Sequence, residues 1–406
     1  MPSSSQTLST AAVAPAVGRL PLLLGFLIAI GPVSVDMYLP AFPTIARDFH
    51  DAAAPGLTLA AYFAGLAIGQ MTQGPFSDRT GRRWPILIGL SIYTLASLGC
   101  AAAWSTDSLS AFRLLAAFGG SASVVVPRAM VRDVADGPAA AMLFSRLMLV
   151  MGVAPIIAPI LGSAVVSVGS WRWIFVIAAV YGVAALALVW FKLPDTLPPA
   201  RRSMVGFRSI VARYGQISAE RHFLANALTG TFAIGALFAY LTGTPGVFIG
   251  EFHWKPLEYA ALFGLNATVY IGFNQWNPHL VARVGLRPVI SASVLLLLAG
   301  TVGLTVAALL GTGAVAIVAS LLVCQASYGF ALPSTMVASL SRHQAHAGSA
   351  SALMGTWQYL GGAIAGAIVG GFADGTARPM AITMLGCAAL AVLASLFRPR
   401  ATLARD

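Results

Sequence analysis

Two charged residues fall inside long apolar stretches of the sequence. Asp36 follows the apolar run LPLLLGFLIAI and lies in GPVSVDMYLPAFP, and Arg113 lies in SLSAFRLLAAFGG. A lone charge in the hydrocarbon of a bilayer costs at least about 2.5–3.5 kcal/mol, so such a residue faces a cavity or finds a partner and usually serves transport. Burial favours the neutral form of a carboxyl group, whereas a nearby arginine favours the anion. Asp36 is therefore predicted to take up and release a proton.

The expected depths of these two residues agree. A helix rises about 1.5 Å per residue. Asp36 therefore lies roughly 24 Å from the inner end of its own span, which begins at Leu20, and Arg113 lies roughly 6 Å from the outer end of its span. Pro40 has no N–H to donate to the carbonyl of residue 36, which leaves that carbonyl free to face a cavity. The alternative to a proton carrier is a structural Asp36–Arg113 pair that only fixes helix packing.

The composition predicts a membrane framework around these residues. The chain has 406 residues, of which 58% are hydrophobic and 9% charged, whereas soluble domains carry about 25% charged residues. The net charge of +11 could indicate nucleic-acid binding, but the charges follow the loops and not one face. Cys100, Cys324 and Cys387 are far apart in apolar segments, as expected of buried thiols. We therefore expect a polytopic membrane protein with no nucleic-acid partner.

The apolar runs predict an all-α fold with twelve transmembrane helices. Each run has roughly the 20 residues needed to cross about 30 Å of hydrocarbon. A single span must be helical there, because its backbone polar groups have no water partners. The predicted spans are 20–42, 56–76, 85–104, 109–132, 141–167, 171–193, 223–250, 256–276, 287–309, 312–336, 347–373 and 379–397.

The basic residues predict the orientation of these spans. Of the 24 Lys and Arg residues, only Arg47, Arg172, Lys255 and Arg378 fall in one set of loops, and nearly all others fall in the alternate set. Loops rich in Lys and Arg face the cytoplasm. We therefore expect both termini in the cytoplasm.

The longest inner loop, residues 194–222, divides the chain into two six-helix bundles at 20–193 and 223–397. This loop is rich in Pro and Arg and is expected to run along the membrane surface. Residues 1–19 are predicted to form a disordered cytoplasmic tail, and 398–406 a second cytoplasmic tail. The segment 74–83 has a faint repeat at 278–287, after a shift of 204 residues. Two halves that both begin inside are related by an axis along the membrane normal.

The most specific motif is GPFSDRTGRR, between the second and third spans. It resembles the loop motif of the major facilitator superfamily, and this resemblance implies a latch that closes the cytoplasmic side while the outside is open. Glycines suit close helix approach and tight turns, and an aspartate can pair with an arginine. The predicted gate residues are Gly74, Asp78, Arg79, Gly81, Arg82 and Arg83, with Asp133 of RAMVRD as the partner of Arg82.

A second motif, GVAPIIAPILGS, lies in the fifth span. Pro155 and Pro159 each remove a backbone donor and bend the helix, and Gly162 with Ala158 makes a small-residue face for close packing. An ordinary bent packing helix has the same features. The stretch is similar to the motif of drug:proton antiporters, in which Gly-Pro-x-x-Gly-Gly is usual, although Ala158 and Ser163 replace two of its glycines.

Several further stretches resemble the bicyclomycin/chloramphenicol-resistance (Bcr/CflA) branch of the major facilitator superfamily. They include DMYLPAFP, LPDTLPPARR, FAYLTGTPGVFI and AGSASALMGTWQYLGGAIAGAIVGGF. The resemblance runs from Leu20 to about Leu396 and implies a monomeric, twelve-helix exporter of small drugs or metabolites in the bacterial inner membrane, driven by protons. It also implies a coupling role for Arg113, for which a purely structural arginine is the alternative.

Polar and aromatic residues within the spans are candidates for the substrate pocket, because pockets for amphipathic drugs combine apolar walls with a few polar groups. Taken singly, each is better explained by ordinary helix packing or cavity polarity than by a specific contact. The candidates are Tyr38, Tyr240, Asn266, Tyr270, Gln325, Tyr328, Gln358 and Tyr359.

Other chemistry finds no support in the sequence. No GxxxxGK[ST] loop is present for ATP, and no HExxH or other metal-ligand spacing occurs among the 6 histidines. We therefore expect no cofactor and no metal. Two alternatives to the exporter remain: a metabolite importer of the same fold that works by proton symport, and a membrane-embedded enzyme acting on lipids. The enzyme would require more embedded acids or histidines than one Asp and one Arg.

Overall fold

The computed structural model describes residues 14–135, 137–202, 207–343 and 346–398. This part of the chain is almost entirely helical and contains no strand, which confirms the predicted all-α fold. Its helices are α1 (Ala14–Ile28), α2 (Ile30–Val35), η1 (Leu39–Ala41), α3 (Phe42–Phe49), α4 (Ala54–Thr80), α5 (Arg83–Ala101), α6 (Thr106–Val134), α7 (Gly137–Val168), α8 (Arg172–Lys192), η2 (Pro199–Arg201), α9 (Phe207–Ala219), α10 (Arg221–Pro245), η3 (Gly246–Glu251), α11 (Pro256–Val284), α12 (Leu286–Leu310), α13 (Ala314–Leu340), α14 (Ala347–Gly371) and α15 (Arg378–Leu396).

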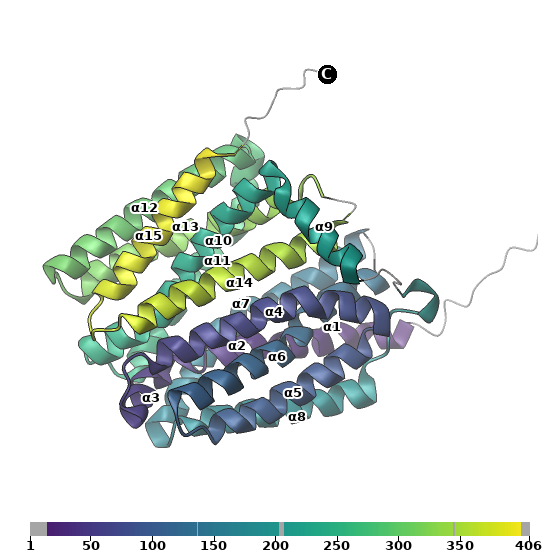
Figure 1. The fold of residues 1–406 in the computed structure, drawn as a ribbon, viewed down its shortest axis with the longest axis horizontal. Coiled ribbons are helices and arrows are strands. Elements are labelled where there is room, and N and C mark those ends of the chain that lie inside the picture. Colours follow the sequence, from purple (N-terminus) through teal and green to yellow (C-terminus); the bar gives the residue numbers. More distant parts are fainter. Residues whose placement is uncertain (1–13, 136, 203–206, 344–345, 399–406) are drawn as a thin grey trace, which may run out of the picture.

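Two helical bundles lie side by side in Figure 1, one formed by α1–α8 and the other by α10–α15. The short helix α9 connects them and lies across one end of the molecule, which we call the α9 end; the other we call the α3 end. Helix α1 begins ahead of the predicted start at Leu20. Of the two predicted tails, residues 1–13 and 399–406 lie outside the described residues.

Nine helical segments in the described part of the chain are long and apolar enough to cross a membrane. The remaining three predicted spans correspond to α4, α7 and α11. Helices α4 and α11 have 27 and 29 residues, which is sufficient length, but polar residues reduce their apolar character. Residues Gly152–Val168 of α7 form a shorter apolar segment. The chain thus has the twelve-helix path expected of a multi-pass membrane protein.

The first span is broken where proline residues interrupt its backbone. Helix α2 follows α1 after Ala29 and ends at Val35, and Asp36 caps it by donating its N–H to the carbonyl of Pro32 at 2.8 Å. Pro40 then stands in the 3-10 turn η1, because a proline cannot continue the α-helical hydrogen bonds. The break places Asp36 at a helix end inside the protein, where it is only 7% exposed.

The two bundles meet along α4 and α14 and along α7 and α11. At the α3 end of the first pair, a Cβ atom on Gly56 would lie 2.4 Å from the Cα of Gly370. Only glycine permits two backbones to approach this closely. The halves are therefore in direct backbone contact at the α3 end.

Candidate functional site

A cavity of about 750 Å³ lies between the two bundles towards the α9 end. Its walls come from α4, α6, α9, α10, α13 and α14. Polar side chains that line it include Gln70, Asp78, Arg128, Arg132, Arg213, His346 and Gln358, and apolar or aromatic ones include Ile234, Phe238, Met354 and Tyr359. A cavity of this size can hold a drug-sized molecule.

An aromatic cluster contributes to the wall of this cavity. The rings of Phe63 and Phe238 stack at a centroid distance of 4.0 Å, and Phe238 stacks with Tyr359 at 6.0 Å. Phe63 belongs to α4 in one bundle, whereas the other two belong to α10 and α14 in the second. The cluster therefore spans the interface between the bundles.

The α3 end, in contrast, is closed by several contacts between the bundles. Besides the Gly56–Gly370 approach, the Ser163 hydroxyl donates to the carbonyl of Pro256 at 2.9 Å, joining α7 to α11. The turn η1 packs against α10 and α11, and α3 packs against η3. The structure is thus sealed at the α3 end and hollow towards the α9 end.

Asp36 lies within this sealed part and faces the second bundle. The hydroxyl groups of Tyr240 and Tyr259, both from the second bundle, and of Tyr62 lie close enough to interact with its charge. None of the described residues forms a hydrogen bond or ion pair with its carboxyl group. Asp36 therefore faces protein at the centre of the molecule and not the surrounding lipid.

Arg113 lies in the core of the first bundle and is only 1% exposed. Its Nη1 donates to the carbonyl of Ser34 at 2.8 Å, and its guanidinium carbon lies 4.2 Å and 4.5 Å from the ring centroids of Tyr62 and Tyr38. Aromatic faces attract a buried cation in this way. The structure does not contain the Asp36–Arg113 ion pair that was considered from the sequence, because each residue has other neighbours.

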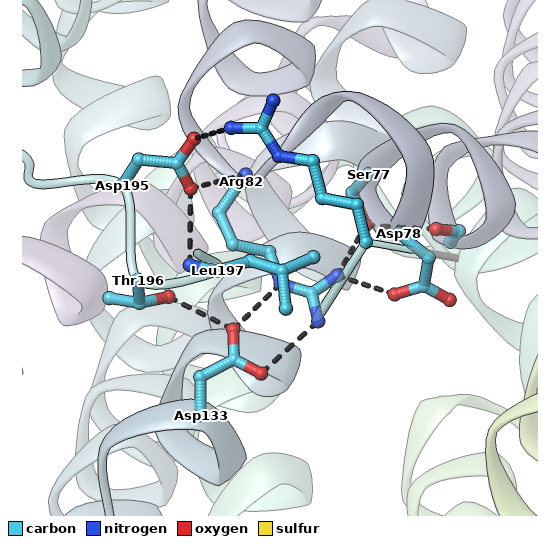
Figure 2. Close-up of polar contacts among 9 residues, drawn as sticks. Ser77, Asp78, Arg82, Asp133, Asp195, Thr196 and Leu197 are labelled. Carbon is cyan, nitrogen blue, oxygen red and sulfur yellow. Dashed lines mark hydrogen bonds and ion pairs between the residues drawn. The ribbon is translucent and has the colours of Figure 1, made fainter. Parts of the chain in front are cut away.

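Arg82 is the centre of a polar network at the α9 end (Figure 2). Its Nε and Nη2 donate to the two carboxylate oxygens of Asp133 at 2.7 and 3.1 Å, and Nη1 donates to Asp78 at 2.6 Å and to Ser77 at 2.9 Å. Burial alone would lower the pKa of Arg82, but its hydrogen bonds and charge interactions with Asp133 and Asp78 outweigh burial and raise that pKa. The contact between Arg82 and Asp133 expected from the sequence is present.

The segment after α8 completes this network, which sequence reasoning did not foresee. Asp195 accepts a hydrogen bond from the Arg82 backbone N–H at 2.8 Å and pairs with Arg202 at 3.1 Å. Thr196 donates to Asp133 at 2.9 Å. The sequence signal was the stretch LPDTLPP directly after the sixth span, in which a short polar turn follows the end of a helix.

Gly81 is required by the geometry of this turn. Its φ of +92° lies in the region that favours glycine, and a Cβ atom there would lie 2.1 Å from the Oδ2 of Asp195. Next to it, Arg83 donates to the carbonyl of Trp190 and lies over the ring of Trp190, 5.6 Å from its centroid. Both residues therefore tie the α4–α5 turn to the end of α8 and the segment that follows it.

The remaining predicted gate residues occupy the neighbouring turn of α4. Gly74 and Asp78 line the cavity. Arg79 is exposed on the last turn of the helix. The network thus joins α4, α5, α6 and the segment after α8, all within the first bundle.

The residues of the fifth-span motif lie on α7, where it faces the broken first span and the second bundle. A Cβ atom on Gly162 would lie 2.1 Å from the carbonyl oxygen of Met37, directly after Asp36. Ala158, one turn earlier, is 4% exposed, and Pro159 beside it is also buried while Pro155 is half-buried. The small-residue face thus allows α7 to pack against the backbone next to Asp36.

Of the predicted pocket residues, the structure brings Gln358 and Tyr359 to the cavity. The other candidates lie outside its lining. Tyr38 shares a hydrogen bond of 2.7 Å with Thr58, and Tyr240 stacks on Phe263 at 6.3 Å. Asn266 donates to the carbonyl of Leu262 at 2.9 Å, one turn back in its own helix. Gln325 and Tyr328 are buried on α13, and Tyr270 is half-buried on α11.

Comparisons with known proteins agree with this architecture. The chain is 34% identical over 382 residues to the uncharacterized MFS-type transporter YdgK of Bacillus subtilis, covering 92% of this chain and 94% of that one. It is 30% identical over 378 residues to the bicyclomycin resistance protein homolog of Haemophilus influenzae, covering 93% and 95%. It is 27% identical over 340 residues to the multidrug resistance protein MdtL of Escherichia coli O157:H7, covering 83% and 85%.

Solved structures show the same fold at low sequence identity. A bacterial homolog of the human lysosomal transporter Spinster, in an inward-facing and unoccupied conformation, matches with a TM-score of 0.73 at 16% identity, covering 95% of this chain and 96% of that one. A sequence profile of the Major Facilitator Superfamily matches residues 23–366. The chain is therefore a membrane transporter and not an enzyme, and it belongs to the Major Facilitator Superfamily, whose Bcr/CflA drug:proton antiporter branch its motifs resemble.

Proposed function

We propose that this transporter exports small amphipathic drugs or metabolites in exchange for protons, by alternating access. It acts as a monomer in the bacterial cytoplasmic membrane, with both termini and the α9 end in the cytoplasm. The basic loops support this orientation, because all three basic residues of GPFSDRTGRR, Arg79, Arg82 and Arg83, lie at the turn from α4 to α5 at the α9 end. The cavity then opens towards the cytoplasm, where an exported substrate would be loaded.

Asp36 carries the proposal for proton coupling. It is an acid at a helix break, 7% exposed, without a hydrogen-bond partner among the described residues, and it faces the second bundle. Burial favours the neutral form of a carboxyl group in such a place, and the group exchanges its proton only with the side from which water reaches it. Movement of the second bundle away from η1 would expose it at the α3 end, where it would take up a proton from outside.

The gate is the second part of the proposal. The Arg82 network holds the α9 end of the first bundle as one unit, so that this end moves as a rigid body when the cavity closes. Gly162 and the neighbouring small residues of α7 allow close packing beside Met37, so a change at Asp36 is transmitted directly to α7. Names of relatives that refer to bicyclomycin and multidrug resistance support drugs as cargo and export as the direction.

The test combines growth and transport assays. Expression in a pump-deleted host, challenged with a drug panel, identifies a compound to which the chain confers resistance. Inverted vesicles with an imposed pH gradient then report transport of that compound and the accompanying proton release. We expect Asp36→Asn to abolish proton-linked transport, because the amide cannot ionise, and Asp107→Asn to retain it, because Asp107 is exposed in the first turn of α6 at the α3 end.

Two outcomes would reject parts of this proposal. Proton-linked efflux that persists in Asp36→Asn would remove Asp36 as the carrier. Uptake of the compound together with protons, in place of efflux, would favour the importer of the same fold.

A further inference from the structure

The cavity at the α9 end has an unbalanced charge that the proton-coupling scheme does not use. Arg128 and Arg132 of α6 and Arg213 of α9 all line it. Asp78 is the carboxylate among the described lining residues, and it is already bound to Arg82 at 2.6 Å. The wall therefore presents positive charge from both sides of the interface between the bundles.

Arg128 is the deepest of these charges along α6. It precedes the end of the helix at Val134 by six residues, or about 9 Å at 1.5 Å per residue. Its side chain is half-buried, and it forms no hydrogen bond or ion pair with a described residue. A half-buried guanidinium without an anion is costly, and its five donors in a planar fork suit a carboxylate or sulfonate.

The surroundings of Arg128 combine polar groups with an aromatic wall. The Tyr359 hydroxyl lies within electrostatic range of Arg128 and interacts with the side chain of Gln70. Tyr359 also stacks with Phe238, which stacks with Phe63. An anionic group held by Arg128 would thus have a flat apolar surface within the same cavity.

We propose that the cavity selects small organic anions, in which a carboxylate or sulfonate binds Arg128 and an attached aromatic or apolar body packs on Phe238 and Tyr359. Arg132 and Arg213, nearer the opening, attract the anion into the cavity. This assignment of the cargo rests on the proposed export function. It also fits the energetics of that function, because an inside-negative membrane potential drives an anion outward and a proton inward.

The experiment compares three ligands that share one aromatic body and differ in charge. These are dansylglycine, which is anionic, dansylglycinamide, which is neutral, and dansylcadaverine, which is cationic. Fluorescence anisotropy measures their binding to the purified full chain in phosphatidylcholine nanodiscs. Because one hydrogen-bonded charge contributes about 1.5–3 kcal/mol, we expect dansylglycine to bind about tenfold to a hundredfold more tightly than dansylglycinamide.

Substitutions at Arg128 then test whether this residue causes the preference for the anionic ligand. Arg128→Gln should reduce the affinity for dansylglycine to that of the neutral ligand and leave the neutral ligand unchanged, while Arg128→Lys should retain part of the preference. Arg128→Glu should reverse the order in favour of dansylcadaverine, a gain that unfolding cannot produce. Arg378→Gln is the matched control, because Arg378 is exposed at the start of α15 and does not line the cavity.

A second variant keeps the test informative if the Arg128 substitutions do not fold. Arg132→Gln combined with Arg213→Gln should weaken dansylglycine several-fold without weakening dansylglycinamide, because both side chains line the cavity nearer the α9 end than Arg128.

Three results would overturn the inference. The first is equal affinity of the three ligands for the unmodified chain. The second is an equal loss of affinity for all three ligands in Arg128→Gln. Addition of phosphatidylglycerol to the nanodiscs could displace dansylglycine in proportion to its content, which would assign the arginines to lipid headgroups. The binding assay needs no proton gradient, so its failure is separate from a failure of proton-linked export in the vesicle assay.

Discussion

Each bundle has a turn between two helices at the α9 end, α4–α5 in the first bundle and α11–α12 in the second. The two turns have the same glycine backbone conformation but different side-chain contacts. Gly81 between α4 and α5 has a φ of +92°, and Gly285 between α11 and α12 has a φ of +87°. In the first bundle the next residue is Arg82, which binds Asp78 and Asp133. In the second bundle the equivalent positions, 204 residues later, are the apolar residues Leu286, Ala282 and Val337.

This difference separates what the turn needs from what the gate needs. The glycine conformation is common to both halves, so it satisfies the geometry of a helix–helix turn. The ion pairs occur at the first turn, where they also reach α6 and the segment after α8. We infer that ion pairs make the first bundle rigid at this end, whereas the equivalent residues of the second bundle form no ion pair and are half-buried or exposed.

Near the second turn, a buried arginine has polar partners but no carboxylate among the described residues. Arg398 follows α15, is 6% exposed and donates to the hydroxyl of Ser291 at 2.6 Å and to the carbonyl of Ser395 at 2.9 Å. Burial, together with the nearby charge of Arg287, lowers the pKa of Arg398 to about 10. The described residues provide no carboxylate for Arg398, in contrast to Arg82.

The strongest test of this comparison is removal of Arg82. Arg82→Gln leaves the Asp133 carboxylate, with a side chain only 15% exposed, without its cation, and breaking a buried pair from one side costs about 3–5 kcal/mol. Leu286→Ala, at the equivalent position of the second turn, should cost about 1 kcal/mol, because this half-buried side chain loses only part of its packing. Thermal unfolding in detergent can be followed with a thiol-reactive dye, since Cys100 and Cys324 are buried.

Equal losses of stability in Arg82→Gln and Leu286→Ala would contradict the assignment of a rigid network to the first bundle. Arg82→Lys is a useful intermediate, because lysine keeps the charge but cannot form the bidentate contact.

A substitution at the two glycines sharpens the comparison. Gly81→Ala and Gly285→Ala both place a side chain at positive φ, a strain of about 1–3 kcal/mol. At Gly81 the new Cβ would also meet Asp195 at 2.1 Å, whereas at Gly285 the nearest atom is the Cδ of Pro288 at 3.8 Å. We therefore expect Gly81→Ala to be the more destabilising by about 1–2 kcal/mol, the cost of disturbed hydrogen bonds to Asp195.

The same unfolding assay measures this difference. If Asp195→Ala is introduced first, the gap between the two glycine substitutions should narrow, since the close atom that remains beside the new Cβ is Nη2 of the Arg202 side chain, at 2.8 Å. A gap of unchanged size without Asp195 would show that the clash with Asp195 does not cause the larger effect at Gly81.

The sequence was sufficient to predict the fold and the Arg82–Asp133 contact, for physical reasons that are local. Apolar runs determine the spans, and a charged residue at a helix end finds an opposite charge at the end of a neighbouring helix. It was not sufficient for Asp195, because contacts of a loop residue depend on how α8 packs beside α5. The motif residues of α4 and α5 carried no information about the segment after α8.

The interior of the molecule was harder to predict than its loops. Asp36 and Arg113 have similar expected depths, but the helix break at Asp36 and the rings of Tyr38 and Tyr62 give them different surroundings. Which residues reach the cavity depends on the rotation of each helix about its axis. That rotation is set by packing, so Gln325 and Tyr328 are buried within the second bundle while Gln358 and Tyr359 line the cavity.

The smallest expected effect belongs to Arg398. Its folded-state pKa of about 10 lies below the ordinary value of 12.5, so the folded protein releases this proton first, and stability gains from deprotonation only as the pH rises above about 10. At neutral pH the residue is charged in both states, and its burial opposes folding while its two hydrogen bonds favour it. Arg398→Gln should therefore change stability by at most about 1 kcal/mol in either direction. A loss as large as that of Arg82→Gln would mean that the second turn also depends on a bound anion, and the contrast between the two turns would then be wrong.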